Sequence, residues 1–181
     1  METVLGVDPG LSGALAVIDV ESKKIQHLYD MPTWLMTIGR KKRKKIDPVR
    51  LYNHIKHAKS LKAKVVVIEQ VGGRPKQSAP AAFSFGYSAG LLYMACASQR
   101  LEIEMVAPAL WKKVMNVPGK TQASPDAIIA RATELFPDER ERFYGPKGGP
   151  LLGRAEACML ARFGIDFIVN REKAERKSSG G

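Results

Sequence analysis

Three acidic residues occupy positions that are unusual for solvent-exposed acids. Asp8 follows the apolar run 4–7, Glu69 ends the apolar run 65–68, and Glu156 lies among small residues. Buried acids are rare unless they are paired or bind a metal. Because carboxylate oxygens are the ligands that Mg²⁺ and Mn²⁺ prefer, the three acids predict a divalent-metal site if the fold brings them together.

The chemistry of such a site is phosphodiester hydrolysis. Two divalent ions roughly 3.5–4 Å apart activate water and stabilise the leaving oxygen. Simpler interpretations stay open at this point. Asp8 is also typical of an Asx turn, although Pro9 and Gly10 already supply the turn, and a Glu in a helix usually faces solvent.

The apolar pattern predicts the elements that must position the acids. Strands are expected at 3–7, 13–20, 25–29, 64–69 and 102–106. Helices are expected from 47 onward, at 78–99, 108–114 and 124–136, and from a start near 151–153 to 163. A meander of three strands followed by two strands reached through helices gives an α/β fold, a five-stranded mixed sheet flanked by α-helices.

Two of the helices carry further expectations. Asp47 is expected to cap the first helix, in which Val49, Tyr52 and Ile55 share one face and the Lys and His residues point outward. In the helix 78–99, Gly86 and Gly90 are four residues apart, a spacing that lets another backbone approach closely.

Positive charge is concentrated in one segment. Residues 39–64 contain eleven of the 29 Lys and Arg residues but only one of the 18 acids, so the rest of the chain is almost neutral. Arg40 to Lys45 are six consecutive cations, which we interpret as a loop. Such a run repels itself unless a polyanion neutralises it, and it predicts phosphate contacts that give affinity without sequence readout. A solvated charge run and a nuclear-localisation signal have the same composition.

Composition bounds the remaining classes. The 181 residues, 45% hydrophobic and 26% charged, fit one globular domain over 1–170 and a charged tail over 171–181 that is expected to be disordered. Cys96 and Cys158 predict buried free thiols in a reducing compartment. No apolar run approaches the roughly 20 residues that cross a bilayer, so we expect no membrane association and a cytoplasmic location, or an organellar one if a transit peptide was removed.

Four motifs together resemble a known family. Gly-Val-Asp-Pro-Gly-Leu-Ser-Gly-Ala, Val-Ile-Glu-Gln, Pro-Ala-Leu-Trp-Lys-Lys and Gly-Arg-Ala-Glu-Ala, in this order, resemble Holliday-junction resolvases of the RuvC type, most closely the branch that includes bacteriophage and chloroplast resolvases. The resemblance covers about Val4 to Phe163. Each motif alone is only moderately specific, whereas their order and spacing together are specific.

The resemblance implies a ribonuclease H-like fold, a homodimer, and Mg²⁺-dependent cleavage of two symmetric strands of a four-way DNA junction, with Mn²⁺ able to substitute and no small-molecule cofactor. Asp8, Glu69 and Glu156 match three catalytic, metal-binding acids of the family, and Lys112 and Lys120 match lysines that meet the scissile backbone. The candidate DNA-contacting residues are Arg40, Lys41, Lys42, Arg43, Lys44, Lys45, Arg74, Lys76, Lys112, Lys113 and Lys120.

Two departures from the family pattern affect these expectations. The family usually has a fourth metal ligand about one turn before the acid at Glu156, where this chain has Leu151-Leu152-Gly153. Three acids and water suffice, or another acid such as Asp126 compensates, or the chain is weakened in catalysis. Residues 72–74 also lack the aromatic that wedges into the junction in some relatives; Phe83, Phe85 or Tyr87 are substitutes, although core packing is expected for at least two of them.

Three functions follow from these observations. The first is a structure-selective endonuclease that cleaves branched DNA as a dimer, with the helix 78–99 as the candidate interface through Phe85, Gly86, Leu92 and Tyr93. The second is a junction-binding protein with weak or no cleavage because of the residues near Leu152. The third, a sugar kinase or ATPase of the actin type, shares the Gly-x-Asp-x-Gly turn but needs a second lobe that 181 residues do not hold.

Overall fold

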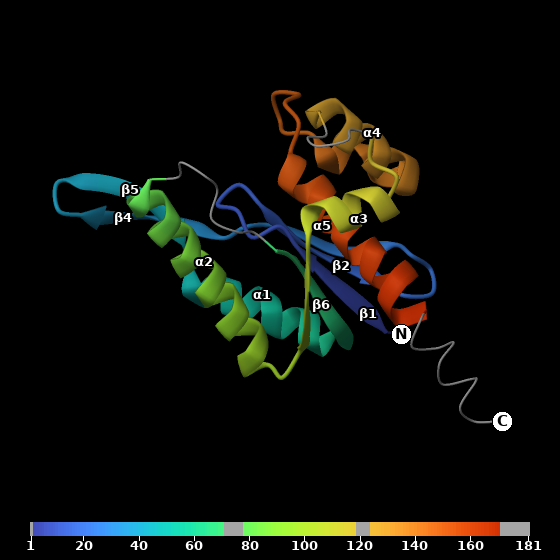
Figure 1. Cartoon of the computed structure of the whole chain (residues 1–181), viewed down its shortest axis with the longest axis horizontal. Coiled ribbons are helices and arrows are strands. Elements are labelled where there is room, and N and C mark those ends of the chain that lie inside the picture. The colour runs from blue at the N-terminus through green and yellow to red at the C-terminus, as the bar shows by residue number, and fades with distance from the viewer. Residues whose placement is uncertain (1, 71–77, 119–123, 171–181) are drawn as a thin grey trace.

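The computed structural model describes residues 2–70, 78–118 and 124–170 (Figure 1). Its centre is a five-stranded sheet in the order β3-β2-β1-β6-β7. Strand β1 pairs antiparallel with β2 and parallel with β6, β2 pairs antiparallel with β3, and β6 pairs parallel with β7. The predicted mixed sheet flanked by helices is therefore confirmed, with the strands at Thr3–Val7 (β1), Ala14–Asp19 (β2), Ile25–Asp30 (β3), Ala63–Glu69 (β6) and Glu102–Val106 (β7).

One edge of this sheet gathers the ends of four strands. The parallel strands β1, β6 and β7 all run toward it, and β3 also ends there, because its last residue, Asp30, pairs with Ala14 at the start of β2. We call this the carboxyl edge. Both Asp8, which follows β1, and Glu69, which ends β6, therefore lie at the carboxyl edge.

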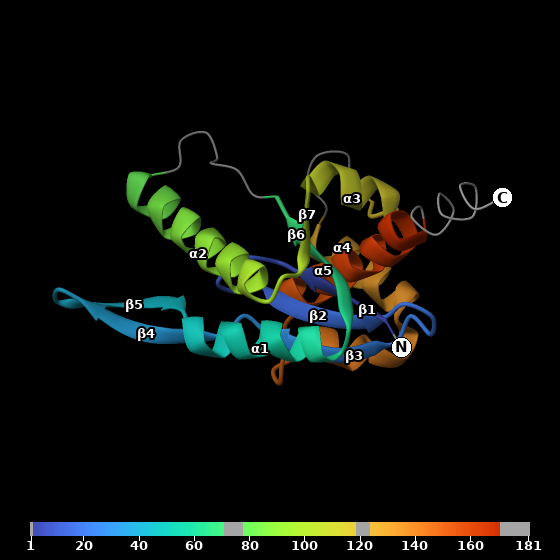
Figure 2. The same cartoon turned by 90° about the horizontal axis from the view of Figure 1, so that it is seen from below.

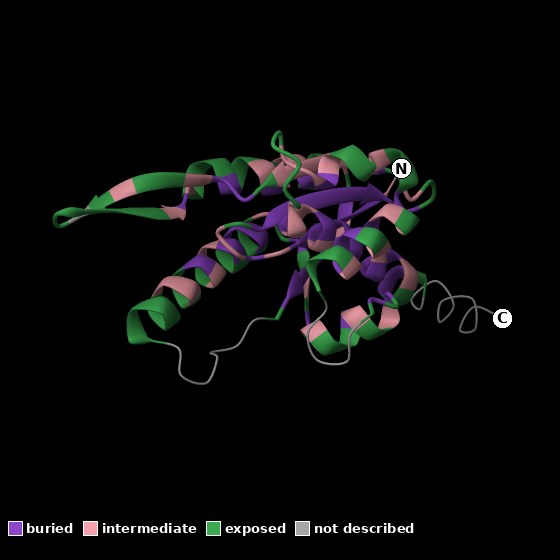
Figure 3. Ribbon diagram, turned by 90° about the horizontal axis from the view of Figure 1, so that it is seen from above, coloured by how far each residue is buried: buried purple, intermediate pink, exposed green. Residues whose placement is uncertain are grey.

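Helices cover both faces of the sheet (Figures 1 and 2). One face packs against α1 (Pro48–Ser60) and α2 (Ala79–Ser98), in a core that includes Val66 and Ile68. The other face packs against α5, in a core that includes Val65 and Val67. Successive side chains of β6 therefore point to opposite faces of the sheet. Because both faces are buried, residues 65–68 are continuously apolar (Figure 3). The other elements on the second face are α3 (Pro108–Val114), α4 (Pro125–Leu135), the 3₁₀ helix Pro137–Phe143, α5 (Leu152–Phe163) and the π-helical segment Gly164–Val169.

Helix α5 touches the sheet backbone because both surfaces are built from small residues. A Cβ atom on Gly6 of β1 would overlap the backbone of Ala157 and Ala161 in α5. The small residues around Glu156 thus allow a close approach to the sheet, and this contact fixes the depth at which α5 presents Glu156.

The basic run was expected to be a loop, and this prediction was wrong. Residues Lys41–Ile46 form strand β5 of a two-stranded hairpin with β4 (Thr33–Ile38), and neither strand was predicted. The consecutive cations show neither strand nor helix periodicity, and only pairing with β4 makes them a strand. Gly39, with φ of +61°, begins the two-residue turn, a position that favours glycine. The hairpin projects away from the sheet (Figures 1 and 2).

Helix α1 begins as predicted but presents a different face. The Oδ1 atom of Asp47 accepts hydrogen bonds from the backbone N–H groups of Val49 and Arg50, both at 3.0 Å. The buried residues of the helix are Leu51, Ile55 and Ala58, whereas Val49 and Tyr52 are exposed. Leu51, Ile55 and Ala58 are four and three residues apart, whereas the predicted set is three and three apart; both spacings fit one helical face, so spacing alone did not distinguish the two faces.

The remaining expectations concern the thiols and the membrane. Cys96 and Cys158 are buried and free, as predicted. Among the described residues, no helix is both long and apolar enough to cross a bilayer.

Candidate active site

Asp8 is positioned by the turn between β1 and β2. Its Oδ1 atom accepts a hydrogen bond from the backbone N–H of Gly10 at 3.2 Å. A Cβ atom on Gly13 would overlap the carbonyl group of Asp8, so the turn closes tightly behind the acid. The Asx-type hydrogen bond is present, but it engages one oxygen of a half-buried carboxylate and leaves the acid available for chemistry.

Glu69 is nearly buried, with 9% of its surface exposed at the end of β6. The indole Nε1 of Trp111, which is fully buried in α3, donates a hydrogen bond to Glu69 Oε1 at 3.1 Å. The bond orients the carboxylate and satisfies one of its oxygens in a place that water reaches poorly.

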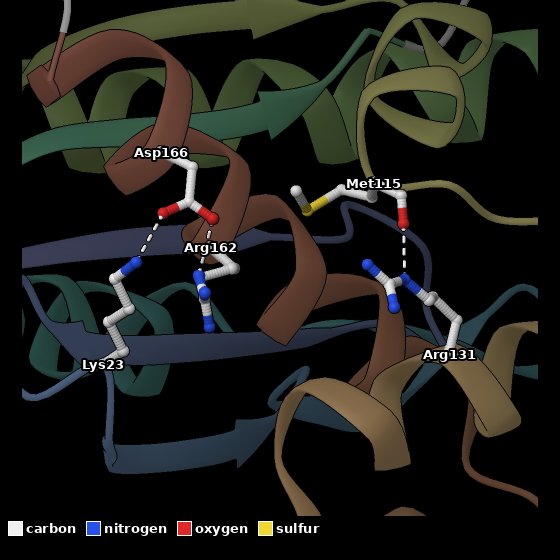
Figure 4. A network of polar contacts seen from close by, with 5 residues as sticks. All are labelled: Lys23, Met115, Arg131, Arg162 and Asp166. Carbon is white, nitrogen blue, oxygen red and sulfur yellow. Dashed lines mark hydrogen bonds and ion pairs between the residues drawn. The ribbon is translucent and has the colours of Figure 1, made fainter.

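Glu156, in α5, forms an ion pair with Lys112, the residue that follows Trp111 in α3. The Nζ atom of Lys112 lies 3.2 Å from Glu156 Oε1 and 5.0 Å from the centre of the Trp111 ring. Two consecutive residues of α3 therefore contact two of the three acids. Helix α3 is itself held by α4, since Arg131 Nε donates to the carbonyl of Met115, the residue that caps α3, at 2.6 Å (Figure 4).

The three acids act on one another electrostatically. The pKa of Asp8 is raised from 3.8 to about 7, mainly by burial; the nearby charges of Glu156 and Glu69 add to the rise, while the Gly10 hydrogen bond and Lys112 oppose it. Burial also raises the pKa of Glu156; Lys112 opposes this rise and Glu69 adds to it. The site thus holds more negative charge than Lys112 compensates, which favours binding of a cation.

The donor chemistry of this cluster fits a divalent metal, since it offers mutually repelling carboxylate oxygens at one partly buried place. The ligand spacing is not preformed, because residues 2–70, 78–118 and 124–170 contain no group of three or more His, Cys, Asp or Glu side chains spaced to hold a metal ion. Lys112 is the cation beside Glu156, so a metal ion held by Glu156 would compete with Lys112 for this carboxylate.

The two positions one turn before Glu156, 152 and 153, lie in different surroundings. A Cβ atom on Gly153 would overlap the carbonyl oxygen of Ser12, so any side chain at position 153 collides with the β1–β2 turn. Leu152 is half-buried and packs against the apolar core on this face. Asp126, in the first turn of α4, is exposed and is not among the charges that shift the pKa of Asp8 or Glu156.

The remaining candidates fall into three groups. Lys112 lies in the site, and Lys113 is exposed beside it. Arg40 to Lys44 are exposed on the hairpin and Lys45 is half-buried. Arg74, Lys76 and Lys120 lie outside the described residues.

Sequence reasoning missed two contacts of the site. Trp111 belongs to the Pro-Ala-Leu-Trp-Lys-Lys motif. Its hydrogen bond to Glu69, however, joins residues 42 positions apart, and no local sequence pattern indicates it. Arg154, two residues before Glu156, forms a two-pronged ion pair with Asp30, with Nε–Oδ1 at 2.6 Å and Nη2–Oδ2 at 2.7 Å. It thereby ties α5 to the end of β3, from which the hairpin departs, and it lowers the pKa of Asp30.

Helix α2 presents an apolar face that no described part of the same chain covers. Phe83 is 75% and Tyr93 is 56% exposed, and within residues 2–70, 78–118 and 124–170 no atom of another element lies within 4 Å of a Cβ built on Gly86 or Gly90. Two expectations were wrong here. Leu92 belongs to the core of its own chain rather than to an interface, and neither Phe83 nor Tyr87 is a core residue.

Beside Glu69, α2 borders a pocket of about 300 Å³ lined mainly by apolar side chains, among them Pro9, Ile68, Tyr93 and Met105. Gly90, which has no side chain, also lines the pocket.

No family model and no curated protein matches the sequence. Solved structures do match. Thermus thermophilus RuvC in complex with a Holliday junction substrate superposes with a TM-score of 0.59 at 13% identity, over 89% of this chain and 90% of that one. Thermus thermophilus RuvC alone gives 0.56 at 15% identity, over 91% and 95%. The yeast mitochondrial Holliday junction resolvase Ydc2 gives 0.51 at 12% identity, over 96% and 84%. The chain has the RuvC-like, ribonuclease H-like fold that the resemblance implied.

Proposed function

We propose that the protein is a structure-selective endonuclease that binds four-way DNA junctions and hydrolyses two symmetric phosphodiester bonds, in DNA recombination and repair. The observation that carries the proposal is the meeting of Asp8, Glu69 and Glu156 around Lys112 at one edge of a RuvC-like sheet. The basic hairpin leaves from the same edge, so the acids and the positive charge face a common substrate.

The proposed cofactor is Mg²⁺, with Mn²⁺ able to replace it, and Asp8, Glu69 and Glu156 would hold it. When bound, the metal activates water and stabilises the leaving oxygen. Trp111 fixes the orientation of Glu69. Lys112, once released from Glu156, neutralises negative charge on the scissile phosphate, and we assign the same task to Lys120.

We propose that DNA binding rests mainly on phosphate contacts. Arg40 to Lys44 offer exposed cations on the turn and one strand of the hairpin, and we add Lys45, Arg74, Lys76 and Lys113 to this set. Such contacts give affinity without sequence readout and weaken steeply as salt rises.

We also propose that the protein acts as a homodimer, because two symmetric cuts require two sites. The exposed face of α2 supports this, since it carries Phe83, Tyr93 and two glycines that leave room for a second helix. Residues 1–170 would form the single domain and 171–181 a tail, in the cytoplasm of a bacterial or phage-infected cell or in an organelle.

A cleavage assay tests the proposal. Purified protein with Mg²⁺ or Mn²⁺ is expected to nick a four-way junction and to leave a linear duplex of the same sequence intact, and Asp8→Asn is expected to bind the junction without cutting it. Equal cutting of the linear duplex contradicts junction selectivity, and cutting by Asp8→Asn contradicts the assignment of the site.

A second candidate is a junction-binding protein with little turnover. The absence of a side chain at Gly153 and the ion pair between Lys112 and Glu156 favour it. Under this reading Leu152→Asp raises cleavage by orders of magnitude with little change in junction affinity. Robust cleavage by the wild-type protein, with no rise in Leu152→Asp, removes the second candidate.

A further inference from the structure

The β4–β5 hairpin has two chemically different faces. Residues directly opposite each other in an antiparallel pair point to the same side of the sheet. Trp34 is opposite Lys45 and Met36 is opposite Arg43, so these four share one face, which we call the inner face. The outer face carries Leu35 opposite Lys44 and Thr37 opposite Lys42.

The inner face is turned toward the N-terminal half of α2. Lys45 Nζ donates a hydrogen bond to Ser84 Oγ at 2.9 Å and lies 5.6 Å from the centre of the Tyr87 ring. Trp34, beside Lys45, is 47% exposed and Tyr87 is 45% exposed. Two exposed aromatic rings thus flank one lysine, with Arg43 farther along the same face. In Figure 2 the hairpin and this half of α2 extend from the body as two arms on the same side.

This surface is connected to the candidate active site. The hairpin follows β3, which ends at the carboxyl edge with Asp30, and Arg154 holds Asp30 two residues before Glu156. A strand that passes the acids therefore has the hairpin as its neighbour on the same edge.

Aromatic rings interleaved with cations are the combination that binds single-stranded nucleic acid, because unpaired bases stack on the rings while Lys and Arg follow the phosphates. A duplex satisfies the cations but keeps its bases stacked on each other. An exposed Trp34 on the hairpin and an exposed Tyr87 on the facing helix α2 are not needed for duplex binding, and they therefore indicate a substrate with accessible base faces.

We propose that Trp34, Lys45 and Tyr87, with Arg43, form a stacking surface for an unpaired or unstacked base of a DNA strand, with Trp34 as the principal stacking side chain. The inference rests on the proposed function for its substrate class, DNA, and deepens it by naming the part of a branched substrate that this surface binds: the bases at the branch, where stacking is interrupted.

Tryptophan fluorescence gives a direct readout, because the chain has two tryptophans and Trp111 is fully buried while Trp34 is exposed. The full chain is titrated with an oligothymidylate of about 20 nucleotides and with a duplex of equal length. We expect the single strand to quench the emission, the duplex to quench it much less, and Trp34→Phe to lose most of the quenching.

Affinity measured by anisotropy of labelled DNA completes the test. Trp34→Ala is expected to weaken single-strand binding about tenfold, within the range for one base on one ring, and to change duplex binding less than about twofold. Leu35→Ala is the matched control, because Leu35 is 69% exposed on the outer face of the same strand. Thermal unfolding checks that both variants are folded.

The outcomes separate this inference from the proposed function. Equal quenching by duplex and single strand, or equal losses in Trp34→Ala and Leu35→Ala, overturns the stacking surface even if the wild-type protein cuts junctions. Quenching that depends on Trp34 and on single-stranded DNA supports the stacking surface even if no junction is cut.

Discussion

Lys112 and Glu156 form an ion pair, with Nζ 3.2 Å from Oε1, on two elements that meet beside Asp8 and Glu69. The side chains are only 26% and 16% exposed. Helix α3 thus supplies the positive charge that the three acids lack, and Trp111, one residue earlier, supplies a hydrogen bond to the second acid. The following predictions depend on this arrangement.

Removal of the lysine charge is expected to destabilise the metal-free protein. Lys112→Met leaves Glu156 desolvated and unpaired, so the free energy of unfolding at pH 8 should fall by about 1–3 kcal/mol. At pH 5 the loss should shrink, because burial raises the pKa of Glu156 and the acid takes up a proton. Urea unfolding at both pH values measures this. Lys113→Met, on the exposed side of the same helix, should stay within about 0.5 kcal/mol of wild type; an equal loss there would refute the prediction.

The pH dependence of stability should report Asp8. Its pKa is about 7 in the folded protein against 3.8 for the free group, so the folded state binds the proton more tightly. The resulting stability is fully present below about pH 4 and is lost as pH rises through about 7, by on the order of 4 kcal/mol. Asp8→Asn should therefore have a higher Tm than wild type at pH 8 and a flatter pH profile. A flat wild-type profile between pH 5 and 8 would contradict this.

Binding of Mg²⁺ should offset the loss of stability that ionisation of Asp8 causes at high pH. A cation that binds the ionised acids stabilises the folded state by mass action, so millimolar Mg²⁺ should raise the Tm of the wild type at pH 8 and raise it less at pH 5, where protons compete. Asp8→Asn should gain less at pH 8. Equal shifts in wild type and Asp8→Asn, measured by scanning calorimetry, would place the ion elsewhere.

Trp111→Phe tests the hydrogen bond to Glu69. The ring stays apolar but the donor is lost, so the free energy of unfolding should fall by about 2 kcal/mol. Junction cleavage should slow by roughly tenfold while junction affinity is retained, because the carboxylate loses its fixed orientation. Met115→Leu is a volume-conserving change at a buried residue four positions after Trp111. It should lower the free energy of unfolding by less than about 1.5 kcal/mol and leave cleavage unchanged. Equal effects of both variants on cleavage would indicate a packing role only.

The apolar face of α2 predicts the oligomeric state. The wild-type protein should sediment as a dimer, and Tyr93→Glu should sediment as a monomer with an unchanged circular dichroism spectrum, since Tyr93 is 56% exposed in a single chain. A wild-type monomer, with and without junction DNA, would contradict the proposed homodimer.

The sequence was informative where a local pattern matched the tertiary environment. Residues 65–68 are buried on both sides and read as continuously apolar, so β6 and its terminal Glu69 were predictable. The hairpin was not, because Lys41–Ile46 becomes a strand only through pairing with β4. The prediction of the buried face of α1 was wrong for a similar reason. The residue spacing allowed two faces, and only packing against the sheet determines that Leu51 is buried.

Contacts between distant positions were the least predictable part of the site. The three acids could be proposed from their local settings, but the partners Trp111 and Arg154 depend on how α3 and α5 lie against the sheet. The missing acid before Glu156 was visible in the sequence. The contact of Gly153 with the β1–β2 turn, which leaves no room for a side chain there, required coordinates.

The bidentate ion pair between Arg154 and Asp30 links the base of the hairpin to α5, the helix that carries Glu156. The root of the arm cannot shift without breaking two charge-assisted bonds or carrying α5 with it. An engineered protein with a shortened hairpin should therefore keep Asp30 and begin the deletion beyond it, so that the ion pair with Arg154 is retained.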